Sequence, residues 1–408
     1  MPDRPDADAD LDPGRRAFLA RSIALGAAGL IGPEFVRGDE PTPAPTGPID
    51  ATMIVRNRRP LDLETPVGAF DAEFTPNARF FVRSHFGEPA VSLAGPWTIA
   101  VRGGVKTPTT FGLDDLARLP QVTIPAVLQC SGNGRAFYRP NIPGVAWERG
   151  AVGQAEWSGP RLVDLLDRAG IAPGMAHVHL HGADGPPLPK NPPYLRSLPL
   201  DRAIAATTIV ATRMNGEPLP VAHGGPARVV VPGWTGNHWI KWINALVVAA
   251  EEAPGFYQRT GYKMPNRPGP PGVDPDPTSL RPVTIQNVKS LFARPTAGSV
   301  IPPGAVDIRG VAWTGGEATV DRVEVEATIA GRARPWAAAR FDGPARPFAW
   351  RTWRFPLALD PTADLGPLVL RVRATDSTGA TQPESAPWNK SGYLWNGYDT
   401  VACEVRRS

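Results

Sequence analysis

Cysteine is scarce in this chain, since only Cys130 and Cys403 occur among its 408 residues. Two cysteines cannot supply a four-cysteine iron–sulfur site or a disulfide framework, and no Cys-x-x-Cys-His haem attachment motif is present. The formal net charge is only +4, and the sequence has no dense basic run. We therefore expect no haem or iron–sulfur cluster in this chain and no nucleic acid as its partner.

Proline and glycine are abundant instead, with 49 and 42 residues. Both residues favour turns and irregular connections over long helices. The hydrophobic content of 42% and the charged content of 20% are ordinary for a globular protein. Because 408 residues are many for a single hydrophobic core, two domains are expected.

Residues 1–50 are predicted to be an export signal and a disordered spacer. An arginine pair, Arg15-Arg16, precedes Phe18-Leu19 and a mildly apolar run over 22–31, a pattern typical of a twin-arginine signal. The apolar run is too short to span a bilayer. Gly14 departs from the usual Ser or Thr, and a disordered basic leader is the alternative. The twin-arginine route carries folded proteins, so the prediction implies the periplasm and a cofactor acquired before export.

Residues 51–264 are predicted to form a mixed α+β domain, because short apolar runs alternate with turn signals along this region. Apolar residues recur at helical spacing over 161–169. Strands are expected at 122–129, 227–232 and 239–249.

A proline- and glycine-rich linker over 265–282 follows this domain. Residues 283–408 are predicted to be all-β, since short alternating runs are separated by turns. Strands are expected at 305–311, 319–329, 347–357 and 368–374. This spacing favours a β-sandwich of immunoglobulin type.

The segment from Leu128 to Arg135 carries the sharpest chemical signal. Cys130 follows a predicted strand and enters a glycine-rich loop, with Arg135 five residues later. A thiolate is a soft ligand that suits a redox-active metal, and glycines let the backbone approach a bulky cofactor. Two other interpretations stay open at this point. Cys130 could be a buried structural cysteine, or it could form a disulfide with Cys403.

Further motifs follow one another in order over residues 55–408. They are Phe81-Val82-Arg83-Ser84-His85, Gln129-Cys130-Ser131-Gly132-Asn133, Gly144-Val145-Ala146-Trp147, Met214-Asn215-Gly216-Glu217-Pro218, His223-Gly224, Arg228-Val229-Val230-Val231-Pro232-Gly233, Lys241-Trp242, Tyr262-Lys263 and Pro387-Trp388-Asn389. In these motifs the chain resembles the sulfite oxidase family of molybdopterin enzymes, and most of all its bacterial periplasmic sulfite dehydrogenases. The resemblance implies a mixed α+β molybdopterin domain followed by an immunoglobulin-like dimerisation domain.

The resemblance also implies one molybdenum–molybdopterin cofactor per chain, with Cys130 as the protein's ligand to the metal. His223, Arg228 and Lys241 would hold the anionic phosphate and the pterin through charge-assisted hydrogen bonds. The loop 182–193 differs locally from the family, so Asp184 and Ser197 are weaker carry-overs. The residues implied to bind the cofactor are Phe81, Val82, Arg83, Ser84, His85, Cys130, Asp184, Ser197, His223, Arg228, Trp239, Ile240 and Lys241.

The substrate pocket implied by the resemblance combines Cys130 with Arg83, Arg135, Trp147 and Tyr262. Guanidinium groups bind small oxyanions such as sulfite through paired donors at fixed geometry. A tryptophan wall excludes water, and a tyrosine hydroxyl can donate a hydrogen bond to oxygen. A lone exposed arginine is usually a solvated surface charge, whereas two arginines beside one cysteine favour an anion pocket.

One position departs from the animal members, which carry a further arginine after the final Trp-Asn. Here Lys390 follows Trp388-Asn389 and is the candidate replacement. Every other pocket residue precedes the linker. We therefore expect residues 283–408 to form a homodimer without being needed for the chemistry.

The implied activity is the oxidation of sulfite to sulfate, with electrons passing to an external acceptor such as a periplasmic c-type cytochrome. Two alternatives stay open. One is a related molybdopterin oxidoreductase acting on a sulfoxide or a carrier-bound sulfur group. The other is an exported binding or scaffold protein that has lost its cofactor.

Two further features carry less weight. His177, His179 and His181 alternate as they would on one face of a strand, which could suggest zinc. Solvated or hydrogen-bonded histidines are the simpler interpretation, because no other ligand set is apparent. The tryptophan-rich stretch 234–242 is expected to belong to the core around the cofactor.

Overall fold

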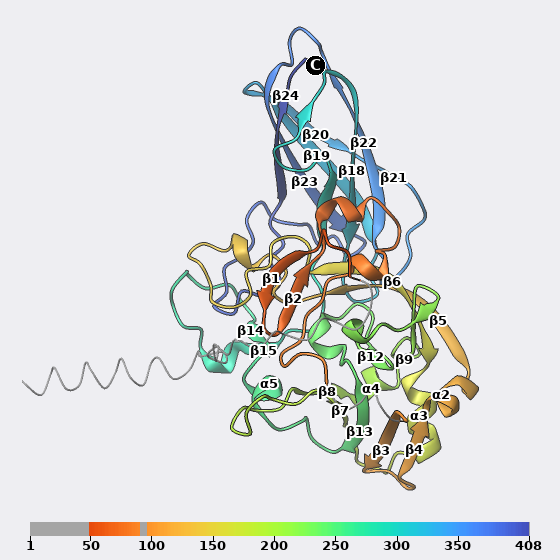
Figure 1. Cartoon of the computed structure of the whole chain (residues 1–408). Helices are drawn as coiled ribbons and strands as arrows, with labels where there is room; N and C mark the ends of the chain where they lie inside the picture. The colour runs from red at the N-terminus through yellow and green to blue at the C-terminus, as the bar shows by residue number, and fades with distance from the viewer. Residues whose placement is uncertain (1–48, 90–95, 408) are drawn as a thin grey trace, which may run out of the picture. The chain divides into compact units, whose positions relative to one another are not determined.

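The computed structural model describes residues 49–89 and 96–407 (Figure 1). The predicted twin-arginine signal lies outside the described residues. The helices are α2 (Leu113–Arg118), α3 (Leu162–Ala169), α4 (Leu200–Ala203) and α5 (Phe256–Arg259), with short 3-10 turns η1 (Val67–Phe70), η2 (Asn77–Arg79), η3 (Arg135–Phe137), η4 (Val221–His223), η5 (Gly236–His238) and η6 (Pro277–Ser279).

The strands of the first domain, up to the predicted linker, are β1 (Ile54–Arg58), β2 (Leu61–Glu64), β3 (Thr98–Gly103), β4 (Thr109–Gly112), β5 (Gln121–Gln129), β6 (Val152–Pro160), β7 (His177–Gly182), β8 (Leu195–Pro199), β9 (Ile209–Ala211), β10 (Arg213–Met214), β11 (Glu217–Pro218), β12 (Arg228–Val230), β13 (Ile243–Ala249) and β14 (Lys263–Pro265). Two main sheets have the orders β4-β3-β13-β7-β8 and β11-β10-β6-β5. In the first of these sheets β13 pairs parallel with β3 and antiparallel with β7. The expected mixture of sheet and short helices is therefore present.

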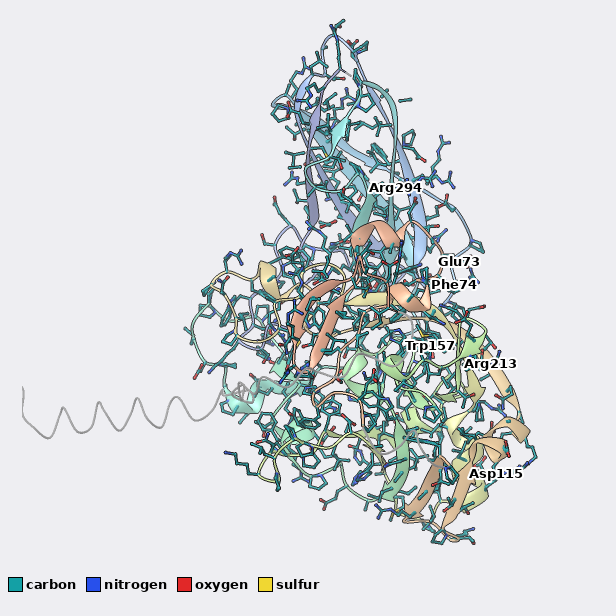
Figure 2. All side chains as sticks on the ribbon, in the orientation of Figure 1. Glu73, Phe74, Asp115, Trp157, Arg213 and Arg294 are labelled. Carbon is teal, nitrogen blue, oxygen red and sulfur yellow. The ribbon has the colours of Figure 1, made fainter. Side chains whose placement is uncertain are left out.

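The helix expected at 161–169 is α3, and its sequence explains it. Leu162, Leu165, Leu166 and Ala169 are buried, which is the spacing of one helical face. Gly170 ends the helix with φ of +68° and caps the carbonyls of the last turn through its N–H. Figure 2 shows Trp157 of β6 among the interior side chains, whereas Asp115 of α2 points outward.

The strands of the second domain are β15 (Leu280–Pro282), β16 (Lys289–Arg294), β17 (Val300–Ile301), β18 (Gly304–Trp313), β19 (Val320–Ile329), β20 (Arg332–Ala338), β21 (Arg340–Phe341), β22 (Arg351–Leu359), β23 (Gly366–Asp376) and β24 (Asp399–Val405). Two sheets, β16-β18-β22-β21 and β17-β24-β23-β19-β20, form the sandwich (Figure 1). Burial alternates residue by residue along β23 and β24, as period-2 side-chain packing requires. The predicted sandwich is present.

A small apolar cluster joins the two domains. Phe70, Val127 and Val152 of the first domain pack with Leu291, Val311 and Trp313 of the second. The indole nitrogen of Trp313 donates to Gln129 Oε1 at 2.6 Å. Gln129 is the residue before Cys130, so the second domain contacts the base of the candidate metal loop.

Two predicted segments differ in detail from the structure. β14 and β15 pair antiparallel across the predicted linker, so that the 265–282 segment is not wholly irregular. The strand predicted to begin at Trp239 begins at Ile243, because Trp242 has a left-handed φ of +51°. No helix in residues 49–89 and 96–407 combines the length and apolar character needed to cross a membrane.

Candidate active site

A hollow of about 700 Å³, counting the space at its opening, lies in the first domain. The residues that line it are Phe81, Arg83, Ser84, His85, Leu128, Cys130, Ser131, Asp184, Tyr194, Ala222, His223, Arg228, Gly236, Asn237, Trp239, Ile240, Lys241, Trp242 and Tyr262. Twelve of the predicted cofactor and pocket residues are in that set, so segments about 180 residues apart in sequence converge on one space.

Cys130 reaches the hollow because β5 ends one residue before it. The Cys130 N–H donates to the carbonyl of Ala151, which precedes β6, and the Cys130 carbonyl accepts from Asn133 N–H at 3.0 Å. Gly134, with φ of +91°, then turns the chain into η3. The Asn133 side chain accepts from Ala151 N–H at 3.2 Å, which ties the loop to the start of the neighbouring strand β6. Backbone bonds therefore hold the thiol in place.

The thiol of Cys130 is not bonded to Cys403, since both cysteines are free. Burial raises its pKa, while the positive charges of Arg83 and Arg135 act in the opposite direction. The disulfide interpretation is therefore excluded. A half-buried thiol that lines the hollow within the field of two arginines fits a metal ligand better than an inert core cysteine.

Arg83 is held by a carboxylate that is completely buried. Its Nη1 donates to Asp62 Oδ1 at 3.2 Å and to the Ser84 carbonyl at 2.5 Å. The bridge between Leu63 and Val82 brings β2 beside the Arg83 segment. Asp62 is 0% exposed, and burial raises the pKa of its carboxyl even beside Arg83. The charge and hydrogen bond of Arg83 act in the opposite direction and favour the carboxylate form with which it pairs.

Three basic side chains lie at another part of the lining. Burial lowers the pKa of His223 to about 3, that of Arg228 to about 9 and that of Lys241 to about 7. Arg228 donates to the carbonyls of His223 and Trp239, and its Nε has no partner. Among the ion pairs of the described residues, none involves Arg228 or Lys241. A bound anion would therefore stabilise the charged forms of these side chains.

Tyr262 closes the lining with a strained backbone, since its φ is +51°. Its hydroxyl and His85 Nε2 lie 3.0 Å apart. Burial, with the nearby positive charges, lowers the pKa of His85 well below its ordinary value, so that the neutral ring accepts from the phenol. The His85 ring also stacks on Tyr194 with centroids 4.3 Å apart.

Four predicted residues do not line the hollow. Val82 packs in a small cluster with Met53 and Leu63. Trp147 is fully buried, and its ring packs edge-on against that of Phe81 with ring centroids 6.4 Å apart.

Ser197 is the clearest departure from the predicted cofactor set. Its hydroxyl accepts from Ala253 N–H, and its own N–H donates to Gln258 Oε1. Both bonds serve the internal structure of β8 and the segment before α5. Arg135, the fourth such residue, lies behind the Cys130 loop with its guanidinium bonded to the carbonyls of Val145 and Ser391.

Sequence reasoning missed several contributors to the site. Tyr194 and Asn237 line the hollow, and the Tyr194 hydroxyl donates to Asn237 O at 2.9 Å. All residues lining the hollow precede the linker, as expected, and one residue of the second domain lies directly behind this lining. Tyr393 stacks on Tyr262 with centroids 5.4 Å apart. Lys390 instead pairs with Asp274 at 2.5 Å and does not line the hollow.

The three alternating histidines of β7 gain no support as a zinc site. His179 Nε2 lies 2.8 Å from the Glu251 carbonyl. Within the described part of the chain, no group of three or more His, Cys, Asp or Glu side chains could hold a metal ion.

Comparisons with known proteins point to one family. A family model described as an oxidoreductase molybdopterin binding domain matches residues 85–257, and a Mo-co oxidoreductase dimerisation domain matches residues 282–406. The sulfite oxidase of Gallus gallus is 35% identical over 359 residues, which are 83% of this chain and 75% of that protein. This chain belongs to the sulfite oxidase family.

Two further proteins are similar to this chain along most of its length. Mitochondrial sulfite oxidase of Mus musculus is 34% identical over 86% of this chain, which spans only 65% of that protein's length. The crystal structure of the sulfane dehydrogenase SoxCD from Paracoccus pantotrophus superimposes with a TM-score of 0.72 at 25% identity, covering 93% of this chain and 97% of that one. The predicted family and its two-domain fold are confirmed.

The side chains around the hollow fit the family's cofactor. A phosphate-bearing pterin needs buried cations, which Arg228 and Lys241 provide, with the Asp184 carboxylate of the same lining acting on the Lys241 charge. A thiophilic metal needs a soft donor at the same space, which Cys130 provides. The residues present are therefore compatible with a molybdenum–molybdopterin cofactor.

Proposed function

We propose that this chain oxidises sulfite to sulfate at a molybdenum–molybdopterin cofactor held by Cys130. The observation that carries the proposal is the hollow in which Cys130, Arg83 and Tyr262 meet, within a chain of the sulfite oxidase family. The bound cofactor would supply the two-electron oxidation and the transfer of oxygen. The protein's share is to bind the anion, orient it and exclude water.

Each side chain then has a physical role. Arg83 lines the hollow and would bind a small oxyanion near Cys130 through its guanidinium donors, and the charge of Arg135 behind the loop would add to the attraction. The single hydroxyl proton of Tyr262 is donated to neutral His85, and it could be donated instead to an oxygen of substrate or product. His223, Arg228 and Lys241 would hold the cofactor's phosphate, since their charged forms are disfavoured without an anion.

The decisive experiment joins metal analysis to turnover. Protein purified from a molybdenum-replete host should contain molybdenum and pterin in about equal amounts, and should reduce cytochrome c only when sulfite is added. Metal and pterin without sulfite oxidation would contradict the proposed substrate. Absence of both from correctly folded protein would favour the binding or scaffold alternative.

A sulfur group other than free sulfite is the second candidate substrate. The relative named as a sulfane dehydrogenase covers nearly the whole chain, and its substrate is a sulfane group by name. Assaying the purified protein in parallel with sulfite and with a sulfane-sulfur compound would separate the two. Faster reduction of the acceptor by the sulfane compound would favour this second candidate.

Replacing Lys241 by methionine should lower the pterin content and stabilise the cofactor-free protein by about 1 kcal/mol. Burial lowers the Lys241 pKa to about 7, so the folded chain holds this proton less tightly than the unfolded chain does. The penalty is full below pH 7 and fades as pH rises toward the unfolded value. Thermal unfolding of cofactor-free protein should therefore show a larger gain at pH 6.5 than at pH 9.5.

The matched control for this variant is Lys106→Met, which removes an exposed lysine of the same domain. It should leave both pterin content and melting temperature nearly unchanged. A Lys241→Met protein with full pterin content would contradict a phosphate-binding role for this lysine.

The second domain is proposed to form a homodimer through residues 283–408. The family model matched there is a dimerisation domain, and two-fold dimers are the commonest oligomers. Light scattering at micromolar concentration should give twice the chain mass. A strict monomer under those conditions would contradict the proposal.

The electron acceptor is proposed to be a separate c-type cytochrome in the periplasm, reached by the twin-arginine route. Two sequence features support this: the arginine pair before Phe18-Leu19, and the lack of a haem motif. Acceptor reduction should slow as ionic strength rises if charge steers the encounter. Cell fractionation would test the compartment.

A further inference from the structure

Two arginines and two tyrosines form a continuous column beside the hollow. The Arg135 guanidinium lies 5.5 Å from the ring centre of Tyr393, and Tyr393 stacks on Tyr262 with an interplanar angle of 10°. The Arg196 guanidinium lies 5.4 Å from the ring centre of Tyr262. Tyr393 is the member that comes from the second domain.

Backbone and side-chain bonds fix the place of Tyr393. Its carbonyl accepts from the Tyr138 hydroxyl at 2.8 Å and from Asn389 Nδ2 at 2.9 Å. Its N–H donates to Asn389 Oδ1 at 3.1 Å, and Asn389 is buried. These three hydrogen bonds fix the backbone of Tyr393. They hold its ring where Arg135 and Tyr262 of the first domain can pack on it.

The Arg135 side chain is closely surrounded by glycines. A Cβ on Gly132, Gly144 or Gly392 would come within 3.0 Å of the Arg135 side chain. Gly144 and Gly392 also have positive φ, of +117° and +63°. The guanidinium bonds only to carbonyl oxygens, and its Nε has no partner. Arg135 is thus oriented by its surroundings while its charge stays uncompensated.

The Arg196 end is similar. Arg196 is 0% exposed and donates to the carbonyl of Tyr257, and its Nη2 lies 2.9 Å from His238 Nε2. None of the ion pairs among residues 49–89 and 96–407 involves Arg196 or Arg135. Two guanidinium groups without an ion-pair partner therefore flank the stacked phenol rings, and the charge of the fully buried one, Arg196, is costly unless an anion is close.

We propose that Tyr393 is a positioning residue for anion binding, which holds Arg135 and Tyr262 in register beside Cys130. Through Tyr393, the packing of the second domain against the first domain influences the anion affinity of the hollow. This inference rests on the proposed oxidation of sulfite. It assigns to the second domain a part in substrate binding as well as in dimerisation.

The test compares Tyr393→Leu and Tyr393→Phe with Tyr398→Leu in the molybdenum-loaded protein. Tyr398 lies five residues further on and packs on Trp336 in the sandwich, so its loss costs an aromatic contact away from the hollow. Four quantities are measured for each: KM and kcat for sulfite, the dissociation constant of sulfate by titration calorimetry, and the melting temperature.

Tyr393→Leu should raise both the sulfite KM and the sulfate dissociation constant about tenfold, with a smaller effect on kcat. Tyr393→Phe keeps the ring and should recover most of the affinity. In an Arg135→Met background, Tyr393→Leu should add less than it does in the wild type, because part of its effect passes through that arginine and the rest through Tyr262.

Unchanged sulfate binding in Tyr393→Leu, with a melting temperature lowered as in Tyr398→Leu, would overturn the inference and leave a packing role. A full additional loss in the Arg135→Met background would also overturn it. If wild-type protein neither oxidises sulfite nor binds sulfate, the proposed function fails first and the anion-binding role with it.

Discussion

Cys130→Ser should abolish sulfite oxidation while the chain still folds. Serine offers a harder oxygen donor than the thiolate, and a thiophilic metal binds it poorly. The loop does not depend on the sulfur for its shape, because the Cys130 N–H and carbonyl bond to Ala151 and Asn133. The measurements are the initial rate with sulfite, the molybdenum content and the melting temperature.

Cys403→Ser is the matched control, since Cys403 is the chain's second free cysteine and lies buried in β24. Its sulfur lies 3.6 Å from the Thr296 carbonyl oxygen. Cys403 packs in the core of the sandwich and does not line the hollow. This variant should keep full activity and metal content. Wild-type turnover by Cys130→Ser would remove Cys130 from the mechanism.

Acid should also weaken metal loading at Cys130. Burial raises the thiol pKa above its ordinary value, so the thiol is protonated at neutral pH until the metal displaces the proton. Loading of cofactor-free protein therefore releases a proton and becomes less favourable as pH falls.

Local signals predicted some of the elements. Helical spacing gave α3, a short apolar run before a loop gave β5, and short alternating runs gave β19 and β23 within a few residues. Cys130 at the end of a strand could be placed because strand and loop are adjacent in sequence. The resemblance to a family then supplied roles that spacing alone could not.

Contacts between distant segments could not be predicted in the same way. Asp62 meets Arg83 only because β2 bridges to the strand-like segment at Val82, and no local pattern encodes that pairing. Tyr393 meets Tyr262 across 131 positions of sequence, through the docking of two domains. Ser197 was predicted near the cofactor, yet its hydroxyl satisfies the Ala253 N–H instead.

Arg83→Met should have two large effects. It should raise the KM for sulfite about ten- to hundredfold, the value of a lost charge-assisted contact of about 1.5–3 kcal/mol. It should also lower the free energy of unfolding by about 3–5 kcal/mol, because it leaves the fully buried carboxylate of Asp62 without its partner. Steady-state kinetics and denaturant unfolding measure the two effects separately.

The stability effect has a definite pH dependence. Burial already raises the Asp62 pKa, and loss of Arg83 should raise it further. A folded state that holds this proton more tightly than the unfolded chain gains stability as pH falls. The destabilisation by Arg83→Met should therefore be largest at neutral pH and shrink as the solution is acidified and Asp62 becomes protonated.

Two comparison variants separate affinity from stability. Arg135→Met removes a guanidinium that bonds only to carbonyl oxygens, so it should raise KM similarly with a much smaller loss of stability. Arg83→Met combined with Asp62→Asn removes the stranded charge and should recover stability without recovering affinity. If the double variant instead restored the wild-type KM, Arg83 would serve only to neutralise Asp62, and the anion would have to be bound by Arg135 alone.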